Sequence, residues 1–259
     1  MSHPLNSRQK AILNKIQGSG RVLVEDLSDM FSTTPQTIRR DLQVLADTGE
    51  VMRFHGGASL PVGVEYTGFD IRRTIAVDAK EAIGRSVASR IPNNATVLIN
   101  GGTTTALVAD ALKDHAGLKI IVDNVNIANN LRIFPGIEVI VPGGTLRRSD
   151  GAILGEAAVD FIRQFRPDIG IIGASAIDGT GALFDFDLGE VHVTRAIIEC
   201  AKHVILAADS SKFGRSAPIR IGDLSRVHTL VTERCDNPDV RDHCLTNNVT
   251  LVEAAGQTH

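Results

Sequence analysis

Polar and basic side chains that could read DNA are concentrated in residues 34–45. Apolar residues recur there at helical spacing, which predicts a helix with one buried and one exposed face. Thr34 suits the N-cap and Pro35 the first turn, where the N–H that proline lacks would have no partner. Arginine and glutamine on the exposed face can pair with base edges or phosphates, although a basic amphipathic helix with a solvated face is the alternative. The buried stripe is Ile38, Leu42 and Leu45, and the exposed face carries Gln36, Arg39, Arg40 and Gln43.

The run Gly101-Gly102-Thr103-Thr104-Thr105 has a composition suited to binding an anion. It follows an apolar stretch that reads as a strand, and it opens a helix. Glycines let the backbone approach an anion, the first N–H groups of the helix attract it, and threonine hydroxyls add donors. The run is not a Walker loop, because no lysine follows its second glycine, and it lacks the third glycine of a dinucleotide site. The sequence therefore predicts a phosphate cradle, with a plain structural turn as the alternative.

Further polar groups follow expected strands or begin expected helices in the same part of the chain. Ligands of parallel sheets bind beyond the carboxyl ends of the strands, so these positions are candidates for the same crevice. Carboxylates can accept hydrogen bonds from sugar hydroxyls, and a lysine can neutralise a phosphate. The alternative is that the acidic residues cap a helix and that the lysine is a solvated loop residue. The candidates are Asn124, Gly143, Gly144, Thr145, Asp185, Asp187, Glu190, Asp209, Ser210, Ser211 and Lys212.

Length and composition allow two domains, since 259 residues with 43% hydrophobic residues can form two buried cores. The net charge of −3 hides a local balance, because residues 1–60 hold seven basic and six acidic residues, and several of the basic ones lie in or after the helix described above. Neither a leader segment nor an apolar run long enough for a membrane span is recognised, so we expect a cytoplasmic protein without membrane contact. The spacing of Cys200, Cys235 and Cys244 indicates neither a metal site nor a disulfide, and we expect buried thiols.

The first sixty residues read as helix, helix, turn, helix and hairpin, in which Ser7 can cap the first helix. Residues 21–24 are expected to be a short strand, and the second helix is expected from about residue 25 to 31. The turn Gly56-Gly57 predicts a hairpin that carries Arg53 and His55. Such a wing would lie along the phosphate backbone and add affinity without reading sequence, whereas a plain β-turn is the alternative.

Residues 61–75 read as a linker, because proline and glycine interrupt any periodicity there. A helix from about residue 77 to 90 is expected to begin a second domain, which spans residues 76–259. Alternation of strands and helices then predicts an α/β domain with a mostly parallel sheet covered on both faces. The expected strands are 96–100, 119–123, 137–141, 168–173, 203–208, 227–232 and 249–253, and the expected helices lie near 104–113, 125–132, 155–165, 188–201 and 238–246.

Three stretches of the first sixty residues resemble the winged helix-turn-helix of the DeoR family of bacterial transcription regulators. They are residues 8–20, the block Pro35-Gln36-Thr37-Ile38-Arg39-Arg40-Asp41-Leu42 and the block Arg53-Phe54-His55-Gly56-Gly57-Ala58. The resemblance implies that residues 35–40 read the DNA groove, with Thr37, Arg39 and Arg40 foremost. The DNA-binding residues expected overall are Thr34, Pro35, Gln36, Thr37, Arg39, Arg40, Arg53, His55 and Gly56.

Residues 80–233 resemble the C-terminal domain of the same family, which is related in fold to sugar-phosphate isomerases and senses phosphorylated sugars or polyols. The likeness is greatest over 155–165, 177–190 and 195–221, where it resembles the glycerol-3-phosphate regulon repressor subgroup. The chain departs from the family where Asp123-Asn124 replaces the usual Thr-Asn pair. The effector site expected from residues and resemblance together is Lys80, Gly101, Gly102, Thr103, Thr104, Thr105, Asn124, Gly143, Gly144, Asp185, Asp187, Glu190, Asp209 and Lys212.

These patterns favour a repressor of a carbohydrate or polyol operon that a phosphorylated sugar or polyol releases from operator DNA, with glycerol 3-phosphate favoured and another sugar phosphate as the alternative. We expect no cofactor, no metal and a homodimer or homotetramer, because one winged helix makes few base contacts. An isomerase of the related fold would carry Lys-Gly-Gly-Gly after Asp178-Gly179, where this chain has residues 180–184 as Thr-Gly-Ala-Leu-Phe, so we do not expect an enzyme. The other hypotheses are an isomerase with an accessory helix-turn-helix and a DNA-binding protein without a ligand.

Overall fold

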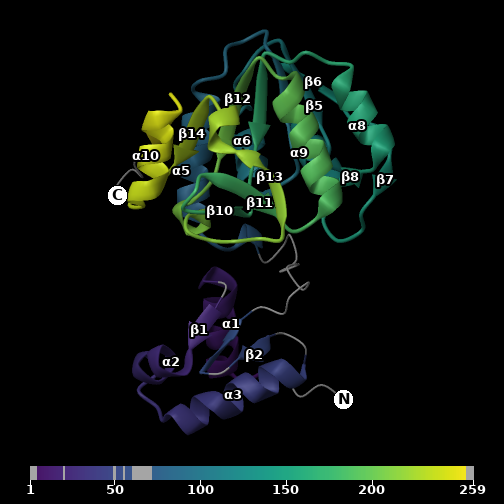
Figure 1. Cartoon of the computed structure of the whole chain (residues 1–259). Helices are drawn as coiled ribbons and strands as arrows, with labels where there is room; N and C mark the ends of the chain where they lie inside the picture. Colours follow the sequence, from purple (N-terminus) through teal and green to yellow (C-terminus); the bar gives the residue numbers. More distant parts are fainter. Residues whose placement is uncertain (1–4, 20, 49–50, 55, 60–71, 255–259) are drawn as a thin grey trace. The chain divides into compact units, whose positions relative to one another are not determined.

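The computed structural model describes residues 5–19, 21–48, 51–54, 56–59 and 72–254. The chain forms two compact units, 1–67 and 68–259, and each is described by itself (Figure 1). The boundary between the units falls within the predicted linker, of which residues 61–71 lie outside the described ranges. Within those ranges, no helix combines the length and the apolar character that crossing a membrane requires.

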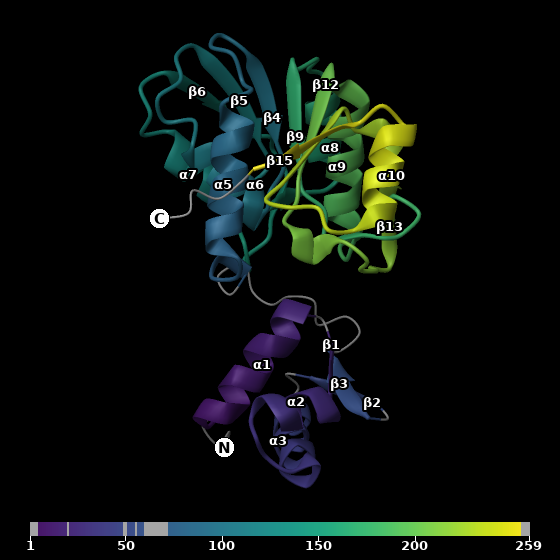
Figure 2. The same cartoon turned by 90° about the vertical axis from the view of Figure 1, so that its left-hand side faces the viewer.

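The first unit is a winged helix-turn-helix, as the sequence predicted. Its strands form an antiparallel sheet in the order β1-β3-β2, so the hairpin packs beside the strand that follows the first helix. Figure 2 shows α1, α2 and α3 grouped against this sheet. The elements are α1 (Ser7–Ser19), β1 (Arg21–Leu23), α2 (Val24–Met30), α3 (Pro35–Asp47), β2 (Met52–Phe54) and β3 (Gly57–Ser59).

The start of α3 has the predicted geometry. Thr34 is extended, and its hydroxyl oxygen accepts a hydrogen bond from the N–H of Thr37 at 3.3 Å, while Pro35 occupies the first turn. The predicted apolar stripe of α3 is fully buried in the core of this unit. The predicted cap of α1 was wrong, because Ser7 is already inside the helix. Asn6 and Gln9 form the cap instead, with Asn6 Oδ1 accepting from the Gln9 N–H at 2.8 Å and Gln9 Oε1 accepting from the Asn6 N–H at 3.0 Å.

The second unit contains a sheet of seven described strands, all parallel, in the order β15-β14-β12-β9-β4-β5-β6. Each predicted strand and helix of this sheet is present, and the predicted ends differ from the observed ones by at most a few residues. The strands are β4 (Thr96–Ile99), β5 (Leu118–Val122), β6 (Ile137–Ile140), β9 (Ile169–Ile172), β12 (His203–Ala207), β14 (Thr229–Thr232) and β15 (Thr250–Glu253). The helices are α5 (Val77–Ala88), α6 (Thr103–Asp110), α7 (Val125–Leu131), α8 (Glu156–Arg163), α9 (Leu188–Cys200) and α10 (Pro238–Thr246).

Helices cover both faces of the sheet. One core joins α5, α6 and α7 to one face, and the other core joins α8, α9 and α10 to the opposite face (Figure 2). Cys235 and Cys244 are buried as expected, whereas Cys200 at the end of α9 is only partly buried, and all three are free thiols. Burial on both faces explains why the strands read as continuous apolar runs in the sequence.

A smaller antiparallel sheet and a short hairpin were not predicted. The small sheet has the order β10-β11-β13 and packs over the second core, and β7 pairs with β8 ahead of α8. Several of these strands are only two residues long and therefore leave no period in the sequence. They are β7 (Thr145–Leu146), β8 (Ile153–Leu154), β10 (Ala176–Ile177), β11 (Ala182–Asp185) and β13 (Ile219–Asp223), accompanied by the short 3-10 helices η1 (Ser210–Lys212) and η2 (Leu224–Arg226).

The order of the large sheet reverses between β4 and β9. From β4 the chain adds β5 and β6 in one direction, and from β9 it adds β12, β14 and β15 in the other. Asn100, directly after β4, holds the two sides together, since its Oδ1 accepts from the Gly173 N–H at 3.0 Å and its Nδ2 donates to Thr194 Oγ1 at 3.2 Å. Such a reversal in a parallel sheet is where ligands of this architecture bind.

Candidate functional site

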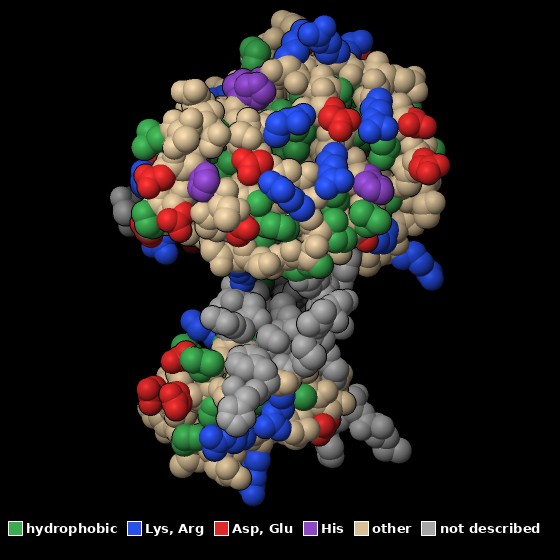
Figure 3. All heavy atoms as spheres, in the orientation of Figure 1, with side chains coloured by type: hydrophobic (Ala, Val, Ile, Leu, Met, Phe, Trp, Pro, Cys, Tyr) green, Lys and Arg blue, Asp and Glu red, His purple; other side chains and the backbone are tan. Residues whose placement is uncertain are grey.

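The exposed face of α3 carries the residues predicted to contact DNA. Gln36, Arg39 and Arg40 are exposed, and Thr37 is half-buried beside the capping residue. Figure 3 shows basic side chains over α3 and acidic ones over α2. The acidic residues of the first unit thus gather over α2 and the basic ones over α3, as the sequence predicted.

The wing brings a third basic side chain to the same helix. Arg53 of β2 donates from Nη1 to Gln43 Oε1, and Gln43 in turn donates to Asp47 at 2.7 Å. Gly56 has φ +94° and is exposed, which explains the glycine at this turn. The predicted contact His55 lies outside the described residues. Arg53 and the exposed face of α3 thus form one continuous polar surface.

A buried carboxylate that the sequence did not single out sets the position of α3. Asp41 is 4% exposed and accepts from Arg8 Nε at 2.6 Å and from Gln9 Nε2 at 3.0 Å. Both donors lie on α1, so the pair of bonds ties the candidate recognition helix to the first helix. The sequence signal for this role was the position of Asp41, an acidic residue directly after Arg39 and Arg40.

In the second unit, Lys80 and the loop after β12 bring opposite charges together. Lys80 is 3% exposed, and burial lowers its pKa to about 8 although Asp209 opposes the shift. Its Nζ donates to the backbone oxygens of Arg72 at 2.7 Å and Ile75 at 2.8 Å, so residues 72–75 of the predicted linker are held against α5. Burial also lowers the pKa of Lys212 in η1. For Asp209, burial alone would raise the pKa, but Lys212 and Lys80 outweigh it and lower the pKa.

Two carboxylates from β11 and α9 extend this cluster. Asp185 accepts from Ser175 Oγ at 3.0 Å and from the Phe186 N–H at 2.7 Å. Burial raises its pKa, against the charges of Arg72 and Lys212. Burial and the neighbouring Asp185 likewise raise the pKa of Glu190. The structure therefore brings together five of the predicted effector residues, namely Lys80, Asp185, Glu190, Asp209 and Lys212.

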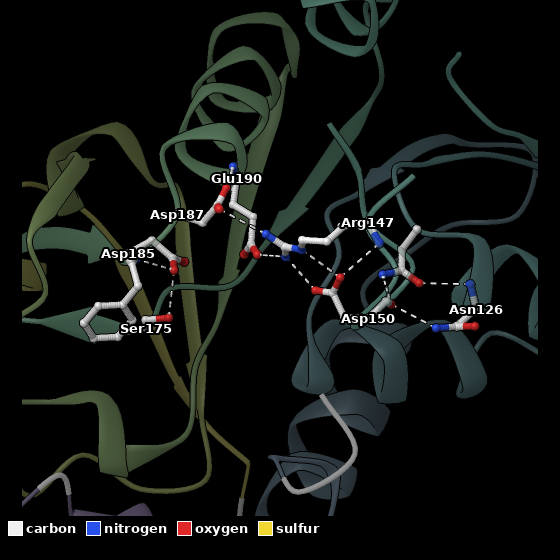
Figure 4. Close-up of polar contacts among 10 residues, drawn as sticks. Asn126, Arg147, Asp150, Ser175, Asp185, Asp187 and Glu190 are labelled. Atoms are coloured by element: carbon white, nitrogen blue, oxygen red, sulfur yellow. Dashed lines mark hydrogen bonds and ion pairs between the residues drawn. The ribbon is translucent and has the colours of Figure 1, made fainter. Parts of the chain in front are cut away.

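Arg147 connects three carboxylates from different elements, as Figure 4 shows. Its Nε and Nη2 donate to both oxygens of Asp150 at 2.9 and 2.6 Å, its Nη1 lies 3.2 Å from Asp187 Oδ2, and its Nη2 also pairs with Glu190. The hairpin β7–β8 is thereby joined to the start of α9. The sequence signal was a basic residue shortly after the glycines that follow a strand, and it was missed.

Asp187 both caps α9, which was the alternative to an effector role, and belongs to the cluster of charged side chains. Its side chain is the N-cap of α9 and accepts from the Glu190 N–H at 2.9 Å, while its other oxygen faces Arg147. Asn124 similarly caps α7, with Oδ1 accepting from the N–H groups of Asn126 and Ile127 and Nδ2 donating to the backbone oxygen of Asp150 at 3.0 Å. Both atoms of the Asn124 amide are engaged by the protein, so this side chain positions the loops around the site.

The predicted cradle lies at the start of α6, whose N-cap is Gly102. Thr105 is fully buried and donates from Oγ1 to the backbone oxygen of Asn100 at 2.7 Å, which fixes the turn. A Cβ on Gly102 would lie 2.9 Å from Thr105 Oγ1, so a side chain there would collide with the turn. Thr103 also borders a groove of about 370 Å³ between α5, α6 and α7, which Asn126, Asn130 and Arg73 line together with apolar residues. Backbone and hydroxyl donors are thus grouped at one helix start.

The last two predicted positions, Gly143 and Gly144, lie on the loop between β6 and β7. A Cβ on Gly144 would meet Leu154, Ile153 and Ala158, so the glycine permits close packing on β8 and α8. Gly143 has no atom within 4 Å of such a Cβ. The loop that contains them reaches the charged cluster through Arg147 instead.

Sequence comparison places both units in one family. The sequence matches the DeoR-like helix-turn-helix domain over residues 8–62 and the DeoR C terminal sensor domain over residues 75–234. The glycerol-3-phosphate regulon repressor of Escherichia coli (strain K12) is 45% identical over 226 residues, which cover 87% of this chain and 90% of that protein. The protein of the same name from Haemophilus influenzae is 44% identical over 225 residues, covering 87% and 88%.

Among solved structures, ribose 5 phosphate isomerase A from Neisseria gonorrhoeae is similar to this chain with a TM-score of 0.39 and 14% identity over 52% of each chain. Family models match both units, and the two repressors are 44–45% identical over 87% of this chain. These matches agree with the winged helix-turn-helix and the α/β unit described above. The chain belongs to the DeoR family.

Proposed function

We propose that this protein is a transcriptional repressor whose first unit binds double-stranded operator DNA and whose second unit binds a phosphorylated sugar or polyol that releases it. The observation that carries the proposal is the exposed face of α3, where Gln36, Arg39 and Arg40 stand opposite a fully buried apolar stripe. Side chains of these types on an exposed helix are the usual readers of base edges and phosphates. The name of the 45%-identical relative supports the same role.

The effector we propose carries a phosphate and several hydroxyl groups, with glycerol 3-phosphate as the first candidate. Lys80 and Lys212 supply positive charge next to buried carboxylates, and the N–H groups at the start of α6 supply further donors. Phosphate binds to the cations and N–H groups, whereas carboxylates such as Asp185 accept hydrogen bonds from hydroxyls. The names of the relatives favour glycerol 3-phosphate within this class.

An isomerase is the second candidate, because the raised pKa values of Asp185 and Glu190 are typical of acid/base pairs in enzymes. The segment after Asp178-Gly179 argues against it. It forms the turn between β10 and β11, in which Asp178 Oδ1 accepts from the hydroxyl of Thr180 at 2.7 Å. A lysine that would act on a substrate is not present at this turn, so we propose sensing rather than turnover.

We also propose a homodimer or homotetramer, because paired half-sites multiply the affinity of a single winged helix.

The DNA-binding part is tested by selecting the operator from a random duplex library and measuring affinity by fluorescence anisotropy. Arg39→Ala is expected to weaken binding by about 1 to 3 kcal/mol, because it removes one base-edge or phosphate contact. Arg163→Ala, an exposed arginine of α8, is the matched control and should bind like the wild type. Equal binding by Arg39→Ala and the control would show that α3 does not read the DNA.

The sensing part is tested by adding glycerol 3-phosphate to the protein–DNA complex and following dissociation. We expect release from the wild type, and we expect Lys212→Ala to keep its DNA affinity while requiring a higher concentration for release. Calorimetry of the same variants without DNA measures effector affinity directly. Unchanged effector affinity in Lys212→Ala would remove this loop from the site, and turnover of glycerol 3-phosphate or ribose 5-phosphate would favour the enzyme.

A further inference from the structure

A carboxyl group at the end of β5 is buried without a complete set of hydrogen bonds. Asp123 is 3% exposed, and its Oδ1 has no hydrogen-bond partner among the described residues. Nearby buried carboxylates are all satisfied, since Asp150 pairs with Arg147, Asp185 with Ser175 and Asp209 with Ser211. A buried polar atom left unpaired destabilises a protein, so its retention calls for a functional explanation.

The unpaired atom lies against the first glycine of the cradle. A Cβ on Gly101 would be 3.6 Å from Asp123 Oδ1, in ordinary van der Waals contact, and 3.2 Å from Asn124 Nδ2, so Gly101 packs directly against both side chains. The N–H of Gly101 is directed toward the Asp123 carboxyl group and favours its charged form. The carboxyl group of Asp123 therefore lies against Gly101, the residue just before the turn that opens α6, beyond the ends of β4 and β5.

The charges around Asp123 decide what kind of group it can receive. Burial and the negative charge of Glu190 raise the pKa of Asp123 to about 7, and the charge of Asp150 acts in the same direction. A phosphate would add to this repulsion. The described residues contain no group of three or more His, Cys, Asp or Glu side chains arranged to hold a metal ion. A neutral donor, such as a hydroxyl group, satisfies the unpaired oxygen without adding charge.

We propose that Asp123 is a specificity-determining residue of the effector site, where its Oδ1 accepts a hydrogen bond from a hydroxyl of a phosphorylated polyol whose phosphate lies at residues 102–105. This inference rests on the proposed function, because it assumes that the second unit binds a phosphorylated effector. It adds the orientation of that effector, with the phosphate at the start of α6 and a hydroxyl at the end of β5.

The test compares two ligands that differ only in their hydroxyls. Glycerol 3-phosphate and n-propyl phosphate are titrated by calorimetry into the full chain and into the variants Asp123→Val and Asp123→Asn. We expect the wild type to prefer glycerol 3-phosphate by about tenfold or more, which is the contribution of a buried hydrogen bond to a carboxyl group. Asp123→Val should reduce this preference by about tenfold and leave the affinity for propyl phosphate unchanged, because it removes only one of the acceptors for the two hydroxyls. Asp123→Asn retains an acceptor oxygen and should keep most of the preference.

The outcomes separate this inference from the proposed function. Phosphate binding with equal affinity for the two ligands in the wild type would overturn the role of Asp123 while leaving the sensor standing. A preference of the same size in Asp123→Val as in the wild type would do the same. Binding of neither ligand by the wild type would overturn this inference together with glycerol 3-phosphate as the effector. Asp160→Val, a change on the exposed side of α8, is the control, and the melting curve of each variant verifies folding, with Asp123→Asn deciding the question if Asp123→Val does not fold.

Discussion

Some buried carboxyl groups have an arginine partner that offsets the free-energy cost of burial, and others lack one. This difference separates residues that hold the fold from candidates for ligand binding. Asp41 and Asp150 each face an arginine at 2.6 Å, Asp41 joining α3 to α1 and Asp150 pairing within the β7–β8 hairpin. Asp123 has a partly unpaired carboxyl group, and two further carboxylates act on it. A paired carboxylate is explained by the contacts of the fold. An unpaired one lowers the folding stability, and a ligand that donates a hydrogen bond to it restores part of that free energy.

Replacing Asp123 by asparagine should stabilise the protein in a pH-dependent way. Its pKa rises from 3.8 in the unfolded chain to about 7 in the folded one. Below about pH 4 both states hold the proton; from there to about pH 7 only the unfolded chain releases it, so folding stability falls as the pH rises. We therefore expect the melting temperature of Asp123→Asn to exceed that of the wild type at pH 8, with a smaller gap at pH 5. The opposite trend, with Asp160→Asn as the control, would place the pKa of Asp123 below its ordinary value.

Replacing Asp41 by alanine should loosen α3. The change removes the acceptor of two bonds from α1 and leaves the amide of Gln9 buried, which should cost about 1 to 3 kcal/mol. Faster amide hydrogen exchange in α1 and α3, together with weaker DNA binding, is the expected result. Asp47→Ala removes an exposed carboxylate from the end of the same helix and is the control. Equal exchange in the two variants would show that Asp41 does not position α3.

At the scale of elements, Arg147 joins the hairpin β7–β8 to the start of α9. Arg147→Ala leaves Asp150, Asp187 and Glu190 facing one another, and breaking a largely buried pair in this way costs about 3 to 5 kcal/mol. We expect faster hydrogen exchange in residues 145–154 and in the first turn of α9. Arg148→Ala, which alters an exposed neighbour, should leave exchange unchanged. Identical exchange in both variants would show that the hairpin is held by other contacts.

Elements that carry their own start and stop signals were predictable from the sequence. The start of α3 was correct because Thr34 and Pro35 act locally, and the large sheet was correct because its buried strands are continuous apolar runs. The small sheet was not predictable, since β10, β11 and β13 obtain their partners from distant residues. The same reason hid Arg147, whose partner Glu190 lies 43 residues away along the chain. Unpaired atoms such as Asp123 Oδ1 exist only once the chain is folded.

At the scale of the whole molecule, the net charge of −3 and the basic face of α3 have opposite effects on DNA binding. Binding depends on local contacts with phosphates, each of which releases counterions, so we expect affinity to fall steeply with salt. Arg53→Ala should lower the affinity for all duplex sequences alike and reduce the slope of log affinity against log salt by about 1 per protomer. Anisotropy at several salt concentrations measures this slope. A change confined to one DNA sequence would mean that Arg53 reads bases rather than phosphates.

The two units have separate hydrophobic cores, and the stretch of chain that joins them is one route by which an effector could influence the DNA-binding unit. The position of Lys80 bears on this route. Its ammonium group has three hydrogens, and two of them are held by the carbonyl oxygens of Arg72 and Ile75, on the stretch that enters α5. A phosphate that drew this ammonium toward itself would compete with those carbonyls. Binding of a phosphate by Lys80 would then weaken the hydrogen bonds that hold residues 72–75 against α5.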